Sequence, residues 1–149
     1  HSPLGELAIL DGSGGVFALD TSGAVTPLSG GVQDMSFDGR GGKILLVKEQ
    51  EIEIVWLRAN TYQPFQPAGT KEKILELDDK ITAARWFYGD DAHLVIETKE
   101  GVFFTELDGR GGRNTIELVS GQVDEIATVP ELANKIFYKK GKSWYTLEL

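Results

Sequence analysis

Short apolar runs separated by turn residues dominate the pattern along the chain. Runs of four to seven apolar, β-branched and aromatic residues alternate with clusters of Gly, Asp, Asn and Pro. Almost no stretch places apolar residues at helical spacing over three turns. The pattern therefore predicts an all-β protein without any helix longer than about ten residues.

These runs recur with a period. A turn followed by an apolar run occurs four times, and the runs begin at Leu7, Ile44, Leu94 and Ile136, an average spacing of about 43 residues. A second run follows each of them, a third follows in three units, and another precedes the turn in three units. Self-similarity at such a period is typical of repeat proteins.

Four strands in a repeat of about 43 residues are typical of one blade of a β-propeller. The runs predict about 14 strands, or about 3.5 four-stranded antiparallel blades. A sandwich and a β-solenoid are alternatives, but a regular period over four units favours the propeller. We expect a single propeller segment over 1–149, with repeat units of about 1–31, 32–80, 81–121 and 122–149, completed into a larger or oligomeric propeller by further blades.

The middle strands of each blade are expected to be covered on both faces by neighbouring blades. Such strands lose clean alternation and become nearly continuous apolar runs, as at 44–47 and 102–107. Trp56, Trp86 and Trp144 also lie in runs, so they are predicted to fill space between blades.

A glycine-rich motif occurs three times, as DGSGG at 11–15 and as DGRGG at 38–42 and 108–112. A glycine cluster beside an arginine can bind phosphate, but such a loop normally leads into a helix, and no helix is predicted after any copy. The three copies also occupy three different connections between strands. Asp hydrogen-bonds to its own following backbone and Gly supplies positive φ, so the motif predicts tight turns.

Two segments carry a family resemblance. The segment SPLGELAIL at 2–10 and the segment VFFTELDGRGGRNTIEL at 102–118 resemble TolB-like and WD-like β-propeller repeats. Similar repeats occur in bacterial envelope proteins that also carry PEGA domains, so the resemblance implies a bacterial protein located in the cell envelope or outside the cytoplasm. The Trp-Asp pair of the strict WD pattern is absent from the ends of the third strands.

Charge limits the choice of partners. Fifteen Lys and Arg against 23 Asp and Glu give a net charge of −8, which opposes binding to nucleic acid or to anionic membranes. No apolar run approaches the length that spans a bilayer. The absence of cysteine excludes disulfides and thiolate chemistry, and it is compatible with the cytosol as well as the cell envelope.

The longest predicted connection, 58–71, carries Tyr62 and Phe65 between prolines. In a propeller this connection opens on the same face as two of the glycine-rich turns. Aromatic and arginine side chains are common in binding interfaces. The predicted contact surface consists of Arg40, Tyr62, Phe65, Arg110 and Arg113. The alternative is a decorated hairpin whose aromatic side chains cover the edge of a blade.

Catalytic chemistry has little support. The chain has two histidines, and the cluster of Asp90, Asp91 and His93 is more simply a solvated turn than a catalytic pair. The carboxylates at 49–54 lack calcium-binding spacing, so we predict no catalytic, cofactor or metal residues. The sequence favours a non-enzymatic scaffold that presents a loop face to a protein or glycan partner. The alternative is an accessory domain of a hydrolase whose catalytic residues lie elsewhere.

Overall fold

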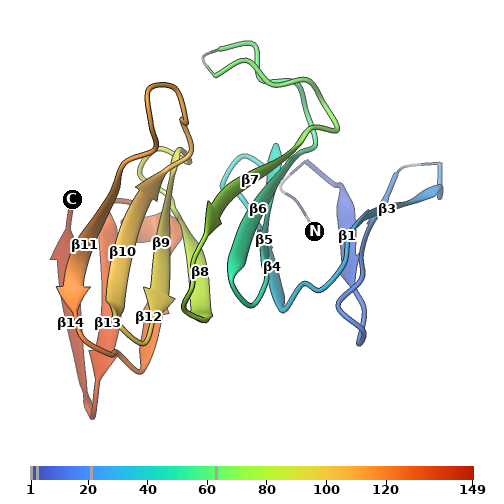
Figure 1. Ribbon diagram of the computed structural model, residues 1–149. Coiled ribbons are helices and arrows are strands. Elements are labelled where there is room, and N and C mark those ends of the chain that lie inside the picture. The colour runs from blue at the N-terminus through green and yellow to red at the C-terminus, as the bar shows by residue number, and fades with distance from the viewer. Residues whose placement is uncertain (1, 3, 21, 63) are drawn as a thin grey trace. The chain divides into compact units, whose positions relative to one another are not determined.

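The computed structural model describes residues 2, 4–20, 22–62 and 64–149, which divide into two compact units, His1–Glu76 and Leu77–Leu149. Within these residues the chain forms 14 strands in four antiparallel sheets, and its one helix is a three-residue 3₁₀ turn at Pro130–Leu132 (Figure 1). The all-β prediction and the strand count are confirmed. No helix in the described part of the chain is long and apolar enough to cross a membrane.

The first unit contains two sheets, which we call blades 1 and 2 (Figure 1). Blade 1 is built from β1 (Leu7–Leu10), β2 (Val16–Leu19) and β3 (Val25–Ser29). Blade 2 is built from β4 (Asp34–Phe37), β5 (Lys43–Val47), β6 (Glu51–Trp56) and β7 (Lys71–Glu76). In each blade, strands that are consecutive in the chain are neighbours in the sheet.

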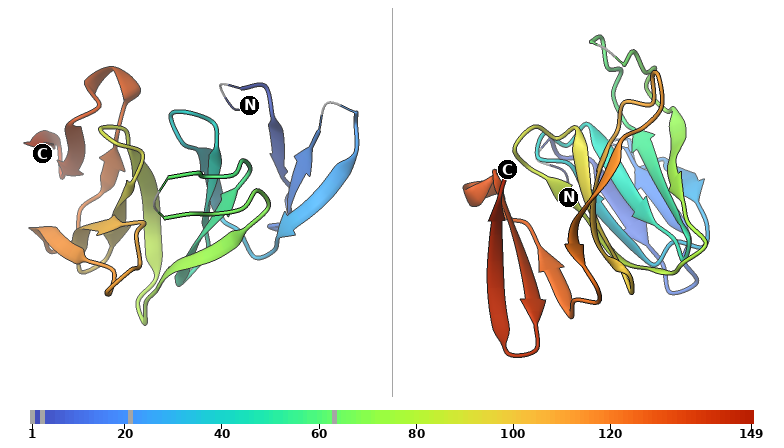
Figure 2. Two further views of the ribbon diagram at one scale, coloured as in Figure 1. Left: turned by 90° about the horizontal axis from the view of Figure 1, so that it is seen from above. Right: turned by 60° about the vertical axis from the view of Figure 1, so that its left-hand side comes forward.

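The second unit contains blades 3 and 4. Blade 3 is built from β8 (Ile81–Phe87), β9 (His93–Thr98), β10 (Gly101–Glu106) and β11 (Thr115–Ser120). Blade 4 is built from β12 (Glu125–Ala127), β13 (Lys135–Lys140) and β14 (Ser143–Glu148). Figure 2 shows the red hairpin β13–β14 at one edge of this unit. The order of three, four, four and three strands follows the order of the apolar runs in the sequence.

One face of blade 1 packs against one face of blade 2. Side chains alternate between the two faces of a strand, so Ala8 and Leu10 of β1 lie on one face and Leu7 and Ile9 on the other. The cluster between the blades contains the buried residues Ala8, Val16, Val32, Ile44, Leu46 and Val55. Leu10 packs against this cluster, whereas Leu7 and Ile9 are not part of it.

Blades 3 and 4 pack in the same way. Their cluster contains the buried residues Phe87, Val95, Val102, Val123, Ile126 and Ile136. Tyr138 and Leu147 of blade 4 pack against it from the same face as Ile136. Blade 4 therefore uses one face for the core of the second unit, and the opposite face lies outside that cluster.

Three middle strands, β5 and β6 of blade 2 and β9 of blade 3, are buried along almost their whole length. In β5, β6 and β9 every residue after the first is buried. This confirms the expectation for 44–47, but the expectation is wrong for β10, whose Phe103, Phe104 and Glu106 are half-buried, and for β14, which is mostly exposed. Trp56 and Trp86 are 5% and 1% exposed, as predicted, but the prediction for Trp144 is wrong, because this side chain is 50% exposed. Trp144 lies on β14 and is outside the cluster of the second unit.

The glycine-rich motifs are turns, as predicted. In DGSGG the Asp11 carboxylate accepts hydrogen bonds from the backbone N–H groups of Ser13 and Gly15, each at 2.8 Å, and Gly14 has φ of +84°. The same arrangement recurs at Asp20, which accepts from Ser22 and Ala24. The Ser2 hydroxyl plays this part before β1, where it accepts from Leu4 and Glu6. A short polar side chain followed three residues later by glycine is thus the common turn of this protein.

Asp38 combines the turn with a buried ion pair. Its Oδ1 accepts from the backbone N–H of Lys43 at 3.0 Å, and its Oδ2 lies 2.9 Å from Lys43 Nζ. The Asp38 side chain is 1% exposed. Replacing Asp38 by alanine should lower the free energy of unfolding by about 2 kcal/mol, because Lys43 then loses this carboxylate and the turn loses its hydrogen-bond acceptor. Asp38→Asn keeps the turn acceptor and should cost less. Urea unfolding of both variants is the measurement, and an Asp38→Asn variant as stable as the wild type would contradict the ion-pair account.

Glu53 joins the two blades of the first unit through a polar contact. Its carboxylate accepts from Ser29 of blade 1 at 2.7 Å and lies 2.9 Å from Lys48 Nζ. Burial of Glu53 opposes its ionisation, but the hydrogen bonds from Lys48 and Ser29 outweigh burial and lower the pKa of this carboxyl below its ordinary value of 4.5. The charged carboxylate is therefore favoured by folding.

The lowered pKa of Glu53 makes stability depend on pH. The contribution is complete above the unfolded-state pKa and is lost as pH falls through the lower folded-state pKa. Glu53→Gln should therefore be less stable than the wild type at neutral pH, and the difference in Tm should shrink as pH falls below 4.5, the ordinary value for this carboxyl. Thermal unfolding of both proteins across this range checks the prediction. A difference in Tm that does not change with pH would contradict it.

Candidate interaction surface

The connection between β6 and β7 is a long, hydrogen-bonded loop, drawn in green in Figure 1. Asn60 and Gln66 form an isolated antiparallel bridge, with backbone N–H···O distances of 2.8 and 3.2 Å. The Asn60 amide donates to the Pro64 carbonyl at 2.9 Å. At the base of the loop, Trp56 and Thr70 are joined by a backbone hydrogen bond of 2.8 Å. These bonds close a small loop, 60–66, at the end of the longer one.

Two aromatic side chains project from this small loop. Tyr62 is 80% exposed and Phe65 is 63% exposed. Neither side chain folds back over the edge of the blade, which was the alternative interpretation of the sequence. Burial does not hold these two side chains in place, because both are mostly exposed. The bridge between Asn60 and Gln66 joins the two backbone segments on either side of them.

Arg40 lies at the same end of blade 2 as the aromatic loop. It occupies the turn between β4 and β5 and is exposed. Antiparallel strands alternate in direction, so the β4–β5 turn and the β6–β7 loop emerge from the same end of the sheet. A contact between the two connections supports this, because the Leu57 N–H donates to the Gly42 carbonyl at 2.9 Å. The structure thus brings together Arg40, Tyr62 and Phe65 at one end of the first unit.

A further arginine at this end was missed by the sequence analysis. The Arg58 guanidinium donates to Glu6 Oε1 from Nε at 3.0 Å and from Nη2 at 2.6 Å. Hydrogen bonds from Ser2 and Arg58 lower the pKa of Glu6, so this carboxylate stays ionised. The pair of Arg58 and Glu6 therefore connects the start of the β6–β7 loop to the turn before β1. An arginine beginning a long loop was visible in the sequence, but its partner 52 residues away was not.

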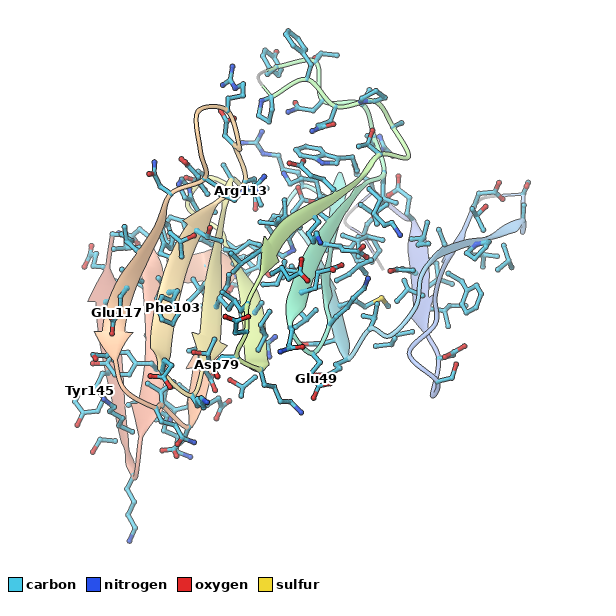
Figure 3. The ribbon with its side chains drawn as sticks, viewed as in Figure 1. Glu49, Asp79, Phe103, Arg113, Glu117 and Tyr145 are labelled. Carbon is cyan, nitrogen blue, oxygen red and sulfur yellow. The ribbon has the colours of Figure 1, made fainter. Side chains whose placement is uncertain are left out.

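In the second unit, Arg110 and Arg113 lie in the β10–β11 loop. Arg110 is exposed and forms a bidentate pair with Asp108, two residues earlier, with Nη2 2.5 Å from Oδ2. Arg113 is half-buried and donates from Nη2 to the Leu107 carbonyl at 2.8 Å. Figure 3 shows Arg113 at the base of this loop. Both side chains thus help to hold the shape of their own loop.

Asp108 and Arg110 in the β10–β11 loop stabilise each other's charged forms. The hydrogen bond from Arg110 lowers the pKa of the Asp108 carboxyl to about 2. The same hydrogen bond raises the pKa of Arg110 above its ordinary value. Because the charges of Asp108 and Arg110 offset each other, this turn presents less positive charge than its sequence indicates. A contact surface that unites Arg110 and Arg113 with the three residues of the first unit stays a prediction.

The acidic turn before β9 contains a contact between a histidine and an aspartate. His93 Nδ1 lies 2.6 Å from Asp90 Oδ2, and the His93 ring stacks on Phe104 with centroids 4.7 Å apart. Asp90 also accepts from the backbone N–H of Ala92. Asp91 is only 9% exposed with φ of +53°, so the expectation of a solvated turn is wrong for this residue. Within the described residues, no group of three His, Cys, Asp or Glu side chains could hold a metal ion.

Comparison with known proteins gives no family by sequence. No family model matches the chain, and no curated protein matches it. Among solved structures, the chain is similar to Sqt1 of Chaetomium thermophilum, a WD40 protein, with a TM-score of 0.64, 13% identity, and coverage of 99% of this chain and 42% of Sqt1. It is also similar to the propeller protein YCF48 from Cyanidioschyzon merolae, with a TM-score of 0.50, 14% identity, and coverage of 88% of this chain and 46% of YCF48.

The chain has a WD-like β-propeller fold. It spans less than half the length of each of these two propeller proteins. Identities this low establish the fold alone, because one fold carries many functions. The TolB-like part of the resemblance, a bacterial origin and an envelope location all stay predictions.

Proposed function

We propose that this chain is a non-enzymatic scaffold segment that binds a protein partner through the β6–β7 loop. The observation that carries the proposal is the pair of exposed aromatic side chains, Tyr62 and Phe65, on a loop closed by the Asn60–Gln66 bridge. A few aromatic and arginine anchors usually supply most of the binding energy of an interface. Arg40 at the same end of blade 2 adds positive charge beside the loop, whereas the charge of Arg58 at the start of the loop is offset by Glu6.

The loop is suited to binding because its backbone is already held by hydrogen bonds. Ordering a flexible loop on binding costs free energy, and a loop that is closed beforehand avoids part of that cost. Tyr and Phe lose little side-chain entropy, since each has two rotatable bonds. The loop therefore combines two exposed aromatic side chains with a backbone that is joined at Asn60 and Gln66.

Charge narrows the class of partner. The protein has a net charge of −8, whereas the end of the first unit that carries the loop includes the exposed Arg40 and the Arg58–Glu6 pair. A partner surface with an apolar pocket and acidic residues at its rim would complement this end of the unit. A glycan partner could also stack on exposed aromatic rings, and the experiment below distinguishes the two.

Photo-crosslinking in the cell of origin tests the proposal. A benzophenone amino acid is placed at position 62 in one strain and at position 116 in another, because Ile116 is 54% exposed but lies on β11. We expect one protein to be crosslinked from position 62 and not from position 116. Crosslinking of carbohydrate alone from position 62 would indicate the glycan alternative. Equal protein capture from both positions would overturn the assignment of the loop.

A further inference from the structure

Blade 1 has one face that no described part of the chain covers in its unit. Alternation along β1 and β2 places Leu7, Ile9, Phe17 and Leu19 on the face opposite the cluster shared with blade 2. On β3, Val25 and Pro27 pair with Leu19 and Phe17, so they continue this face. We call these six residues the leading face of blade 1. Ile9 is 44% exposed and Val25 is 59% exposed.

The repeat register shows what this face does in the other blades. Leu7 pairs with Leu19 as Ile44 pairs with Val55 in blade 2 and as Ile136 pairs with Leu147 in blade 4. In blades 2 and 4, these pairs lie in the cluster against the preceding blade. The leading face of blade 1 therefore has the residues of a blade-to-blade contact, and no described residue of its unit covers it.

Blade 4 has the complementary face. Its pairs Phe137–Thr146 and Lys139–Trp144 lie opposite the face that carries Ile136. The equivalent pair in blade 3, Val95–Phe104, packs against the following blade. We call the face of Phe137, Lys139, Trp144 and Thr146 the trailing face of blade 4. Trp144 at 50% exposure on this face explains the failure of the prediction that it is a core residue.

We propose that the leading face of blade 1 binds the trailing face of blade 4 in a second copy of this chain. Each face lacks the neighbour that its repeat position has elsewhere, and a leading face always meets a trailing face inside each unit. Such a contact is head-to-tail, so the two copies use different surfaces. It goes beyond the proposed function and involves no residue of the β6–β7 loop.

Charge supports a second copy as the occupant. Blade 1, over residues 2–31, contains no lysine or arginine and three carboxylates, of which Glu6 pairs with Arg58 whereas Asp11 and Asp20 lie in the turns beside the leading face. The β13–β14 hairpin, over 135–142, contains four lysines. Lys139 lies on the trailing face itself, beside Trp144. Local attraction between these surfaces acts against the general repulsion of two chains with net charge −8.

Sedimentation equilibrium of the 149-residue chain tests the proposal. We expect reversible association between about 1 and 200 μM for the wild type, and a dissociation constant at least about tenfold weaker for Ile9→Asp and for Trp144→Asp. The control Ile116→Asp changes a residue of similar exposure on β11 and should associate as the wild type does. Tyr62→Ala should also associate normally, which separates this proposal from the proposed function.

Mixing Ile9→Asp with Trp144→Asp, the two variants with impaired self-association, is the decisive test of a head-to-tail contact. The Ile9→Asp copy retains a normal trailing face, and the Trp144→Asp copy retains a normal leading face. A head-to-tail contact therefore predicts that the mixture forms a heterodimer with close to wild-type affinity, which also shows that both variants are folded. A wild-type chain that stays monomeric over the whole concentration range, or a mixture that associates no better than either variant alone, would overturn the proposal.

Discussion

Replacing Ile136 by alanine is expected to lower the free energy of unfolding by about 3 kcal/mol. Ile136 has no exposed surface and lies in the cluster between blades 3 and 4. Truncation removes buried methyl and methylene groups and leaves a cavity that two packed sheets cannot easily close. Because Ile44 has the equivalent position in blade 2, Ile44→Ala should have a similar cost.

The matched control for this pair is Ile116→Ala. Ile116 is 54% exposed on β11, so truncation there should change the free energy of unfolding by less than about 0.5 kcal/mol. Chemical denaturation of the three variants is the measurement. Costs for Ile44 and Ile136 no larger than the cost for Ile116 would contradict the assignment of these two positions to the contacts between blades.

Gly101→Ala is the second substitution expected to have a large effect, at about 3 kcal/mol. A Cβ at this position would lie 2.2 Å from the carbonyl oxygen of Val119, well inside van der Waals contact. Gly101 begins β10 beside an irregularity in the β10–β11 register, where the two backbones approach closely. The backbone of one strand must therefore move, which disturbs the hydrogen bonds of the hairpin.

Gly30→Ala is the control, because a Cβ there meets nothing within 4 Å. We expect its free energy of unfolding to stay close to that of the wild type. Amide hydrogen exchange of β10 and β11 adds a local test, since protection should fall around Val119 in Gly101→Ala only. Normal stability and normal protection in this variant would show that the close approach is wrong.

Much of the fold could be predicted from the sequence because it depends on local patterns. The runs that begin at Leu7, Ile44, Leu94 and Ile136 mark, to within one residue, the first strand of blade 1 and the second strands of blades 2, 3 and 4. The turns were also predictable, since the hydrogen bonds of an Asp or Ser turn join residues a few positions apart. The pair of Asp108 and Arg110 belongs to the same class, because both residues lie within one turn.

Other features depend on partners that lie far away in the sequence. Trp144 is exposed because no described residue of its unit packs on that face of blade 4, which the sequence of β14 does not reveal. The burial of Asp91 and the bond between Ser29 and Glu53 likewise depend on tertiary packing. Exposed aromatic residues in a loop were predicted as one of two alternatives, and only the closed 60–66 loop decides how Tyr62 and Phe65 are presented.

The affinity of the crosslinked partner for variants of the β6–β7 loop tests the central claim most directly. Isothermal titration with the purified partner compares the wild type with Tyr62→Ala and Phe65→Ala, and Ile116→Ala is the control. Loss of an exposed aromatic anchor should raise the dissociation constant at least about tenfold, which corresponds to about 1.4 kcal/mol. The Tm should not fall, because neither side chain is buried. Dissociation constants within about twofold of the wild type for both loop variants would contradict the account.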